Sequence, residues 1–206
     1  MDVPANRFKR AIAAQNSQIG FWCSLASNVS VEILAGSGFD WLLLDTEHSP
    51  NELPQVFSQL QAMMENDTHP IVRPAWNDMV LIKRFLDAGV QTLLIPTIQS
   101  KEEAEAAVSY TRYPPNGVRG YASGSRSSRF GRIEDYHNRC EAELCVLVQI
   151  ETKKGLDNLD EIVDATVALI KKPDITVDGL MKHVRGPDFP TSGIIYGAAG
   201  IVDAYK

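Results

Sequence analysis

The chain has 206 residues, of which 44% are hydrophobic, and it carries a formal net charge of −6. That length suits one ordinary domain or one barrel, and the scattered Lys and Arg residues form no basic stripe, which argues against a nucleic-acid-binding protein. No run approaches the roughly 20 apolar residues of a membrane span, and residues 1–15 lack the apolar centre of a signal peptide.

Residues 1–160 alternate short apolar runs with helical patterns. Residues 1–15 predict a short amphipathic helix. Apolar runs then predict strands at 19–25, 39–45, 70–74, 90–96 and 144–151. Runs at intervals of about 20 to 30 residues, each followed by a helix-like pattern, are typical of repeated βα units around a parallel sheet.

Capping residues mark the helices between these strands. The expected N-caps are Ser49 or Asn51, Asn77 or Asp78, and Ser100. In the first of these helices Leu60 and Met64 fall on one face, and Gly89 ends the second helix. The stretch 116–132 is polar and rich in Gly and Ser, and at this length we expect it to be functional or mobile.

Three cysteines, Cys23, Cys140 and Cys145, are an odd number, and two of them fall in predicted strands. We expect reduced, buried thiols and therefore a cytoplasmic protein. His69 and His137 are expected to do no more than cap loops.

Polar residues end several of the predicted strands. Asp45 ends the second strand, Arg73 the third, and Gln149 and Glu151 the fifth. Parallel strands that are buried on both faces are continuously apolar, so a polar residue is expected only where a strand leaves the sheet. In a (β/α) barrel these strand ends share one rim, where catalytic groups gather.

The residue types on this rim favour metal-assisted chemistry beside a keto group. Glu151 would hold a hard divalent cation such as Mg²⁺, with water and substrate as further ligands. His48, three residues after Asp45, would act through water as a base that Asp45 orients, and Arg73 would hold a carboxylate in two places. No lysine ends a predicted strand, which argues against a Schiff-base aldolase.

Each of these residues also has a purely structural interpretation. A single Arg or Glu at a strand end is more often part of a surface ion pair, and His48 alone would cap a loop. Their combination on one predicted rim favours a site instead. In the polar stretch, Arg126 and Arg129 would either bind the far carboxylate of a substrate or simply face solvent.

Residues 18–160 resemble the HpcH/HpaI aldolase/citrate lyase family, in particular its 2,4-dihydroxyhept-2-ene-1,7-dioate (4-hydroxy-2-oxoheptanedioate) aldolase branch. The resemblance is carried by GFDWLLLDTEHSPN, PIVRPAWND, LIKRFLDAGVQTLLIPTIQSKEEAEAAVSYTRYPPNGVRG and LCVLVQIET. It implies a TIM (β/α)8-type barrel, here incomplete with about five βα units. It also implies an enzyme of aromatic compound catabolism that makes or breaks a carbon–carbon bond to pyruvate with Mg²⁺, Mn²⁺ or Co²⁺.

The same resemblance implies a role for each rim residue. His48 would be the catalytic histidine with Asp45 beside it, and Arg73 would contact the pyruvate carboxylate and the oxyanion. Gln149 would contact the substrate, and Glu151 would bind the metal. Family members are homo-oligomers, but the C-terminal helices that assemble them are not recognisable here, so the oligomeric state stays open.

From residue 161 the pattern changes, because the βα rhythm stops. The sequence predicts a helix over 161–172, a break at Pro173 and a second helix capped by Thr176. The stretch GPDFPTSGIIYG resembles the A subunit of DNA gyrase and topoisomerase IV, but Tyr196 does not match the active-site tyrosine of that family. The family's second metal ligand, an Asp in a GPADLS-like motif, has at most an imitation in Asp188.

We therefore expect two parts, a partial barrel at 1–160 and an unrelated, mostly helical segment at 161–206, joined by fusion or, alternatively, produced by divergence of an aldolase. The function expected is that of a class II pyruvate aldolase, which cleaves a 4-hydroxy-2-oxo acid reversibly to pyruvate and an aldehyde. An inactive barrel without the second metal ligand is one alternative. A topoisomerase-related DNA-binding fragment is another, and it rests on 161–206 alone.

Overall fold

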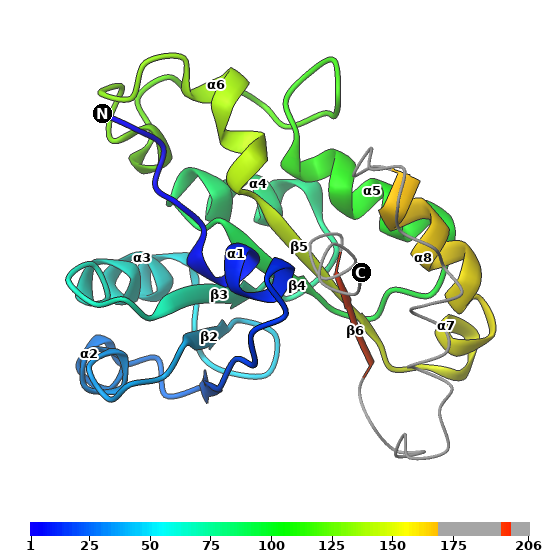
Figure 1. The fold of residues 1–206 in the computed structure, drawn as a ribbon, viewed down its shortest axis with the longest axis horizontal. Coiled ribbons are helices and arrows are strands. Elements are labelled where there is room, and N and C mark those ends of the chain that lie inside the picture. The colour runs from blue at the N-terminus through cyan, green and yellow to red at the C-terminus, as the bar shows by residue number, and fades with distance from the viewer. Residues whose placement is uncertain (169–194, 199–206) are drawn as a thin grey trace.

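The computed structural model describes residues 1–168 and 195–198 of the chain. Five strands form one parallel sheet in chain order (Figure 1): β1 (Gly20–Cys23), β2 (Trp41–Asp45), β3 (His69–Arg73), β4 (Thr92–Ile95) and β5 (Cys145–Ile150). The helices are α1 (Arg7–Ala13), α2 (Asn28–Ala35), α3 (Leu53–Ala62), α4 (Met79–Asp87), α5 (Lys101–Thr111), α6 (Tyr136–Arg139), α7 (Lys153–Asp157) and α8 (Leu159–Ala168), with the 3₁₀ helices η1 (Arg126–Ser128) and η2 (Cys140–Glu143). All five predicted strands are confirmed, as is the helix predicted within 1–15.

Both faces of the sheet are apolar, because alternate residues of each strand point to opposite sides. The face covered by helices contains Leu42, Leu44, Val72, Leu93, Val146 and Val148. The opposite face contains Leu43, Ile71, Leu94, Cys145 and Leu147. Burial on both sides explains the continuous apolar runs in the sequence, and it matches the wall of a (β/α) barrel with its inner and outer surfaces.

The barrel wall is open, as predicted from the sequence. Among the described strands, β1 pairs only with β2, while β6 (Ile195–Ala198) pairs with β5 in the antiparallel sense. This strand lies in the segment that was expected to be mostly helical, beyond the two helices predicted there, and no strand was predicted for these four residues. A free edge of β5 offers unpaired backbone groups, and a short apolar segment that reaches it gains hydrogen bonds by pairing.

Helix α8 runs through the boundary that was expected between residues 160 and 161. Leu159, Ile162, Val163 and Ala165 are buried in the same core cluster as residues of α4 and α5, and α8 lies along α5 in Figure 1. The first residues beyond the expected boundary are therefore part of the barrel's helical layer. The division into two parts stays a prediction. Asp188 and the helix that was expected to begin at Thr176 both lie outside the described residues.

Two of the expected N-caps are confirmed. Asp78 Oδ1 accepts hydrogen bonds from the backbone N–H groups of Val80 and Leu81 at 2.8 and 2.9 Å. Ser100 Oγ accepts one from the N–H of Glu103 at 3.3 Å. Such caps satisfy the free N–H groups of a first helical turn, and they fix where α4 and α5 begin after their strands.

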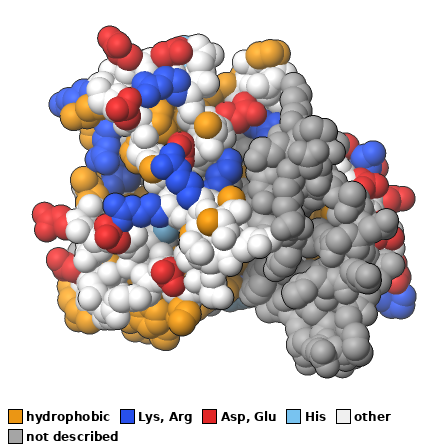
Figure 2. All heavy atoms as spheres, viewed as in Figure 1, with side chains coloured by type: hydrophobic (Ala, Val, Ile, Leu, Met, Phe, Trp, Pro, Cys, Tyr) orange, Lys and Arg blue, Asp and Glu red, His pale blue; other side chains and the backbone are white. Residues whose placement is uncertain are grey.

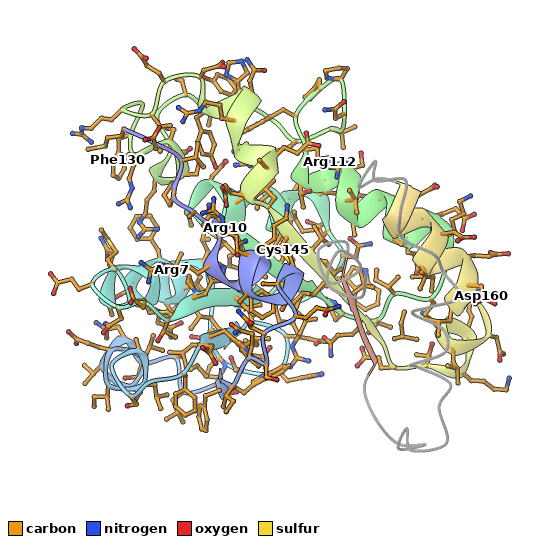
Figure 3. The ribbon with its side chains drawn as sticks, viewed as in Figure 1. Arg7, Arg10, Arg112, Phe130, Cys145 and Asp160 are labelled. Carbon is orange, nitrogen blue, oxygen red and sulfur yellow. The ribbon has the colours of Figure 1, made fainter. Side chains whose placement is uncertain are left out.

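Helix α1 covers the end of the sheet at which the strands begin. Its Phe8 belongs to the inner apolar cluster, with a ring centroid 6.4 Å from that of Trp41. Arg7 and Arg10 extend from the helix (Figure 3), and Arg10 pairs with Glu143 at 2.6 Å. Helix α1 thus closes the inner space of the wall at its amino end.

His69 begins β3 at this closed end and is buried. Its Nε2 lies 2.8 Å from Thr92 Oγ1, and its ring stacks on Phe8 with centroids 6.1 Å apart. Burial, together with the nearby charge of Arg7, lowers the pKa of His69 to about 4. The residue is therefore part of the core and not a loop cap.

We expect this histidine to make the fold sensitive to acid. Its pKa is lower in the folded chain than in the unfolded chain, so the unfolded state binds the proton first as the pH falls. From pH 7 to pH 4, wild type should lose about 3 kcal/mol more unfolding free energy than His69→Gln, in which this position does not titrate. Urea unfolding at both pH values measures this, and equal losses in the two proteins would contradict it.

The three cysteines are free and buried, as expected. Burial raises the pKa of Cys23 to about 11 and that of Cys145, at the start of β5 (Figure 3), to about 12. Little thiolate forms near neutral pH at such values, so these two side chains serve as small apolar groups and not as nucleophiles.

Exposed apolar side chains gather at the free edge formed by β1 and α2, namely Ile19, Phe21, Leu25, Val29 and Ile33. Figure 2 shows hydrophobic side chains collected at its lower left, on the side where Figure 1 places α2. An uncovered sheet edge of this kind favours pairing with a further segment or chain. None of the described helices is both long and apolar enough to cross a membrane.

Candidate active site

Asp45 and Arg73 end neighbouring strands at the same height, as register partners of β2 and β3. Arg73 donates from Nε to Asp45 Oδ1 at 2.8 Å and from Nη2 to Asp45 Oδ2 at 2.7 Å. Trp22 of β1 covers one face of the guanidinium, with Cζ 4.9 Å from the ring centroid. Two parallel hydrogen bonds and a stacked ring fix the plane of this group.

The Asp45 carboxylate stays ionised in this buried setting. Burial alone would raise its pKa, but hydrogen bonds from Arg73 and from the backbone N–H of Glu47 outweigh burial and hold the pKa below its ordinary value. Because both oxygens of Asp45 bind Arg73, one edge of the planar guanidinium is already occupied. Arg73 is therefore not free to hold a substrate carboxylate through the edge that Asp45 covers.

Glu47 also belongs to this cluster, although the sequence interpretation gave it no role. Its Oε2 lies 2.9 Å from Arg73 Nη1, and its side chain is only 13% exposed. Burial raises the pKa of Glu47, and the negative charges of Glu151 and Asp45 act in the same direction. Glu47 follows the end of β2, where strand alternation no longer predicts the direction of a side chain, and its only signal was its place in DTEH.

The loop that carries Glu47 and His48 is held by residues that were expected to cap α3. Ser49 Oγ donates to the carbonyl oxygen of Asp45, and the buried Asn51 donates from Nδ2 to the same oxygen at 2.9 Å. The N-cap of α3 is Glu52 instead, whose backbone N–H donates to Gln55 Oε1 at 3.2 Å. Ser49 and Asn51 thus fasten the loop to the end of β2 and do not begin the helix.

A second detail of this helix also differs from the prediction. Leu60 is buried as expected, but Met64 is 55% exposed. The reason is that α3 ends at Ala62, so Met64 no longer follows the helical spacing.

His48 lies at the mouth of the wall, with its side chain 75% exposed. Asp45 was expected to orient this imidazole, and that stays a prediction. Asp45 binds Arg73 through both oxygens and also accepts a hydrogen bond from the backbone N–H of Glu47 at 3.0 Å. The carboxylate nearest to the ring nitrogens is that of Glu47, whose Oε1 lies 3.5 Å from His48 Nε2.

Gln149 is the penultimate residue of β5, and Glu151 directly follows the strand. Gln149 is completely buried; its Oε1 lies 3.5 Å from Arg73 Nη1, and its Nε2 has no partner among the described residues. Glu151 is exposed, and its Oε1 accepts hydrogen bonds from the N–H and Oγ1 of Thr97 at 3.0 and 2.7 Å. Thr97 has φ of 52°, an unfavourable region for a β-branched residue, and this conformation presents both of its donors to Glu151.

Arg126 lies elsewhere, so its expected place beside the substrate was wrong. Its guanidinium donates to the carbonyl oxygens of Ala88, after α4, and Leu60, in α3, at 2.6 and 3.4 Å. Both helices run opposite to the strands, so their carboxyl ends lie beside the amino end of the sheet. Arg126 therefore stabilises helix termini, where cations are favoured, and holds the long polar loop in place.

The charges at the carboxyl end suit a hard divalent cation. Three carboxylates, those of Asp45, Glu47 and Glu151, raise the pKa of the one guanidinium among them, that of Arg73. Three acids beside one cation leave an excess of negative charge. Carboxylate oxygens, completed by water and substrate oxygens, are the usual ligands of such ions. Among the described residues no group of three or more His, Cys, Asp or Glu is arranged to hold a metal.

Comparison with known proteins places these features in context. A family model described as HpcH/HpaI aldolase/citrate lyase matches residues 18–181. A pyruvate aldolase of Rhizobium etli is 54% identical over 162 residues, which cover 79% of this chain and 64% of that protein. A 4-hydroxy-2-oxo-heptane-1,7-dioate aldolase of Klebsiella pneumoniae is 49% identical over 189 residues, which cover 90% of this chain and 71% of that protein.

Solved structures agree on the fold. An HpcH/HpaI aldolase/citrate lyase family protein from Burkholderia cenocepacia superimposes with a TM-score of 0.75 at 37% identity, covering 78% of this chain and 65% of that one. The chain thus spans about two-thirds of the length of the relatives it matches. The family match continues past residue 160, and the comparisons lend no support to the gyrase-like interpretation of 161–206.

Proposed function

Because the chain belongs to the HpcH/HpaI aldolase/citrate lyase family, we propose that it is a metal-dependent class II aldolase that cleaves a 4-hydroxy-2-oxo acid reversibly to pyruvate and an aldehyde. The observation that carries this proposal is the cluster of Asp45, Arg73, Gln149 and Glu151 at the carboxyl end of the parallel strands, with His48 at its mouth. In barrels of this type, that end is where catalysis occurs.

In the cleavage direction, His48 would accept the proton of the 4-hydroxyl group, directly or through one water molecule. The bond between C3 and C4 then breaks, the hydroxyl carbon becomes the aldehyde carbonyl, and the electron pair passes to pyruvate as its enolate. Uptake of a proton at C3 completes pyruvate. The exposed position of His48 suits this step, because its ring reaches the space that a substrate enters.

Arg73 would donate to the oxygen on which negative charge develops. Asp45 binds Nε and one hydrogen of Nη2 of Arg73. The N–H groups of Arg73 that do not bind Asp45, those of Nη1 and the second of Nη2, would be the ones that contact a substrate oxygen. A donor whose plane is fixed in advance stabilises such charge without a cost of reorganisation. The unpaired Nε2 of the buried Gln149 supports a further contact with a substrate oxygen beside it.

Glu151 would hold the divalent metal, for which Mg²⁺, Mn²⁺ and Co²⁺ are the candidates. Bound there, the metal would polarise the keto oxygen and stabilise the enolate charge. The hydrogen bonds from Thr97 fix the Glu151 carboxylate, as supporting contacts commonly do for metal ligands. The free, buried cysteines fit a reducing compartment, so the proposal includes a cytoplasmic location. The partners proposed are small molecules, a 2-oxo acid and an aldehyde.

The proposal is tested by adding 4-hydroxy-2-oxoheptanedioate and shorter 4-hydroxy-2-oxo acids, with each of the three metals, and measuring pyruvate by coupled reduction to lactate. Metal-dependent release of pyruvate supports the assignment. Its absence with every substrate and metal would favour an inactive barrel, an alternative that fits the lack of a group of three or more potential metal ligands among the described residues.

Metal binding separates these two functions directly. We expect Glu151→Gln to weaken Mn²⁺ binding at least about tenfold, because an amide oxygen replaces the charged ligand. Calorimetric titration of the purified protein measures this, with Glu32→Gln on the exposed surface of α2 as the matched control. Equal affinities of wild type and Glu151→Gln would remove Glu151 from the metal site.

A further inference from the structure

A cavity of about 300 Å³ opens at the amino end of the sheet, at the other end of the strands from Asp45 and Arg73. Around it lie the start of α1, the end of α3 with the turn before β3, the residues between α4 and β4, and η1 with the turn after it. We propose that this cavity binds a small oxyanion with two negative charges, of the phosphate or dicarboxylate class. The proposal goes beyond the aldolase function, since such a ligand would not occupy the strand ends.

Positive charge is in excess around this cavity. Its lining contains three guanidinium groups, those of Arg7, Arg126 and Arg129. The one carboxylate in the lining is that of Asp67. His69 also lines the cavity and, with a pKa of about 4, is neutral at pH 7. The chain as a whole is acidic, with a formal net charge of −6, so this local excess of two positive charges suits a dianion.

The excess is visible on the surface. Figure 2 shows Lys and Arg side chains gathered on the face of the molecule that α1 occupies in Figure 1. Figure 3 places Arg7 on the side of α1 that faces α3. Arg7 pairs with Asp67, but both side chains are largely exposed, and exposed ion pairs of this kind contribute little stability. Arg7 can therefore exchange Asp67 for a bound anion at small cost.

Arg126 is the half-buried cation of the three. Its guanidinium donates to the carbonyl oxygens of Ala88 and Leu60 at 2.6 and 3.4 Å, and its Cζ lies 5.5 Å from the ring centroid of Phe57. Burial lowers the pKa of Arg126, the charge of Arg129 lowers it further, and the described part of the chain supplies no carboxylate to oppose them. An arginine has five N–H donors, so the two carbonyl oxygens leave donors for a ligand. An anion bound beside Arg126 and Arg129 would offset their repulsion.

The turn that carries Arg129 is held by the loop itself. Ser128 Oγ donates to the carbonyl oxygen of Ser123 and accepts from the N–H of Gly131, both at 3.0 Å. Arg129 and Phe130 have φ of 53° and 57°, in the left-handed region that residues with side chains seldom adopt. Such conformations persist only where surrounding contacts hold them, and they are concentrated at ligand sites. Among the described residues, the guanidinium of Arg129 has no hydrogen-bond or ion-pair partner, so a ligand would supply its first one.

A purely structural role for these arginines predicts a different outcome. Cations that only hold helix ends and a loop respond to all salts alike, through screening. A binding site predicts saturable binding of particular anions, and this binding depends on Arg129, although the guanidinium of Arg129 holds no element of the described fold.

Calorimetric titration of the purified protein with inorganic phosphate and, separately, with succinate at one fixed ionic strength tests the proposal. We expect at least one of the two to bind saturably, and the tighter one identifies the class of ligand. Arg129→Gln should weaken that binding at least about tenfold, because a charged donor is lost. Arg84→Gln, which changes an exposed arginine of α4, is the matched control and should bind as wild type does. No saturable binding of either anion, or equal affinities of wild type and Arg129→Gln, would overturn the proposal.

A second variant fixes the location, because Arg73 at the carboxyl end is also a cation. Arg73→Lys leaves the amino end unchanged, so its affinity for the anion should stay within about threefold of wild type. Loss of binding in Arg73→Lys, with none in Arg129→Gln, would place the anion at the carboxyl end and refute the amino-end site. In urea, the bound anion should raise the unfolding midpoint of wild type more than NaCl of equal ionic strength does, and Arg129→Gln should abolish this difference. None of these measurements involves pyruvate release, so they decide the proposal whether or not the aldolase assay succeeds.

Discussion

Replacing His48 by Ala is expected to lower the rate of pyruvate release at least about a hundredfold. The imidazole lies beside the Glu47 carboxylate, and in the proposed reaction it is the base that accepts the 4-hydroxyl proton. Since its side chain is 75% exposed, its loss should leave the unfolding free energy almost unchanged. The loss would therefore appear in the rate and not in the amount of folded protein.

The measurement is a coupled pyruvate assay at saturating metal and substrate, combined with a urea unfolding curve for each variant. His137→Ala provides the matched control, because this second exposed histidine lies in α6, far along the chain from the cluster. Activity of His48→Ala close to that of wild type would show that another group accepts the proton.

Replacing Arg73 by Ala should have two large effects at once. The rate of pyruvate release should fall at least about a hundredfold, because in the proposed reaction Arg73 donates to the oxygen on which negative charge develops. The unfolding free energy should also fall by about 3 kcal/mol, since Asp45, whose side chain is 2% exposed, would keep a buried charge without its partner.

Arg73→Lys separates these effects. A lysine returns one positive charge to Asp45 and Glu47, so most of the stability should return. Its compact ammonium lacks the planar fork that binds both oxygens of Asp45 in parallel and still presents a donor to the substrate. The rate should therefore stay low while the urea midpoint recovers. Arg84→Ala, which removes an exposed arginine of α4, is the control for a loss of charge alone. A rate recovered in Arg73→Lys would reduce the role of Arg73 to that of a simple counter-charge.

The sequence predicted the strands and their polar ends well because these follow from one physical cause. A strand buried on both faces admits no polar residue until it leaves the sheet, so Asp45 and Arg73 had to mark strand ends, and their pairing in register follows from parallel neighbours. Gln149 and Glu151 were found by the same argument at the end of β5.

What the sequence could not predict lies in the loops. Glu47 follows the last residue of a strand by two positions, and only the folded loop, tied down by Ser49 and Asn51, turns it toward Arg73. Arg126 was misplaced for a related reason, because the path of a long Gly-rich and Ser-rich segment leaves no periodic trace. The start of α3 was misjudged because several adjacent polar residues were equally good caps, and only tertiary contacts chose Glu52.

The matched heights of Asp45 and Arg73 have a consequence for how such a protein can vary. The salt bridge is fixed by ladder position and not by distance along the chain, so the surface turn at residues 64–67, between α3 and β3, can change in length without separating the two residues. A slip of a single residue in β3 would instead turn the guanidinium out among the helices and put an aliphatic side chain at the mouth. Insertions in such surface turns are thus tolerable over evolution, whereas insertions within β2 or β3 would separate Asp45 from Arg73.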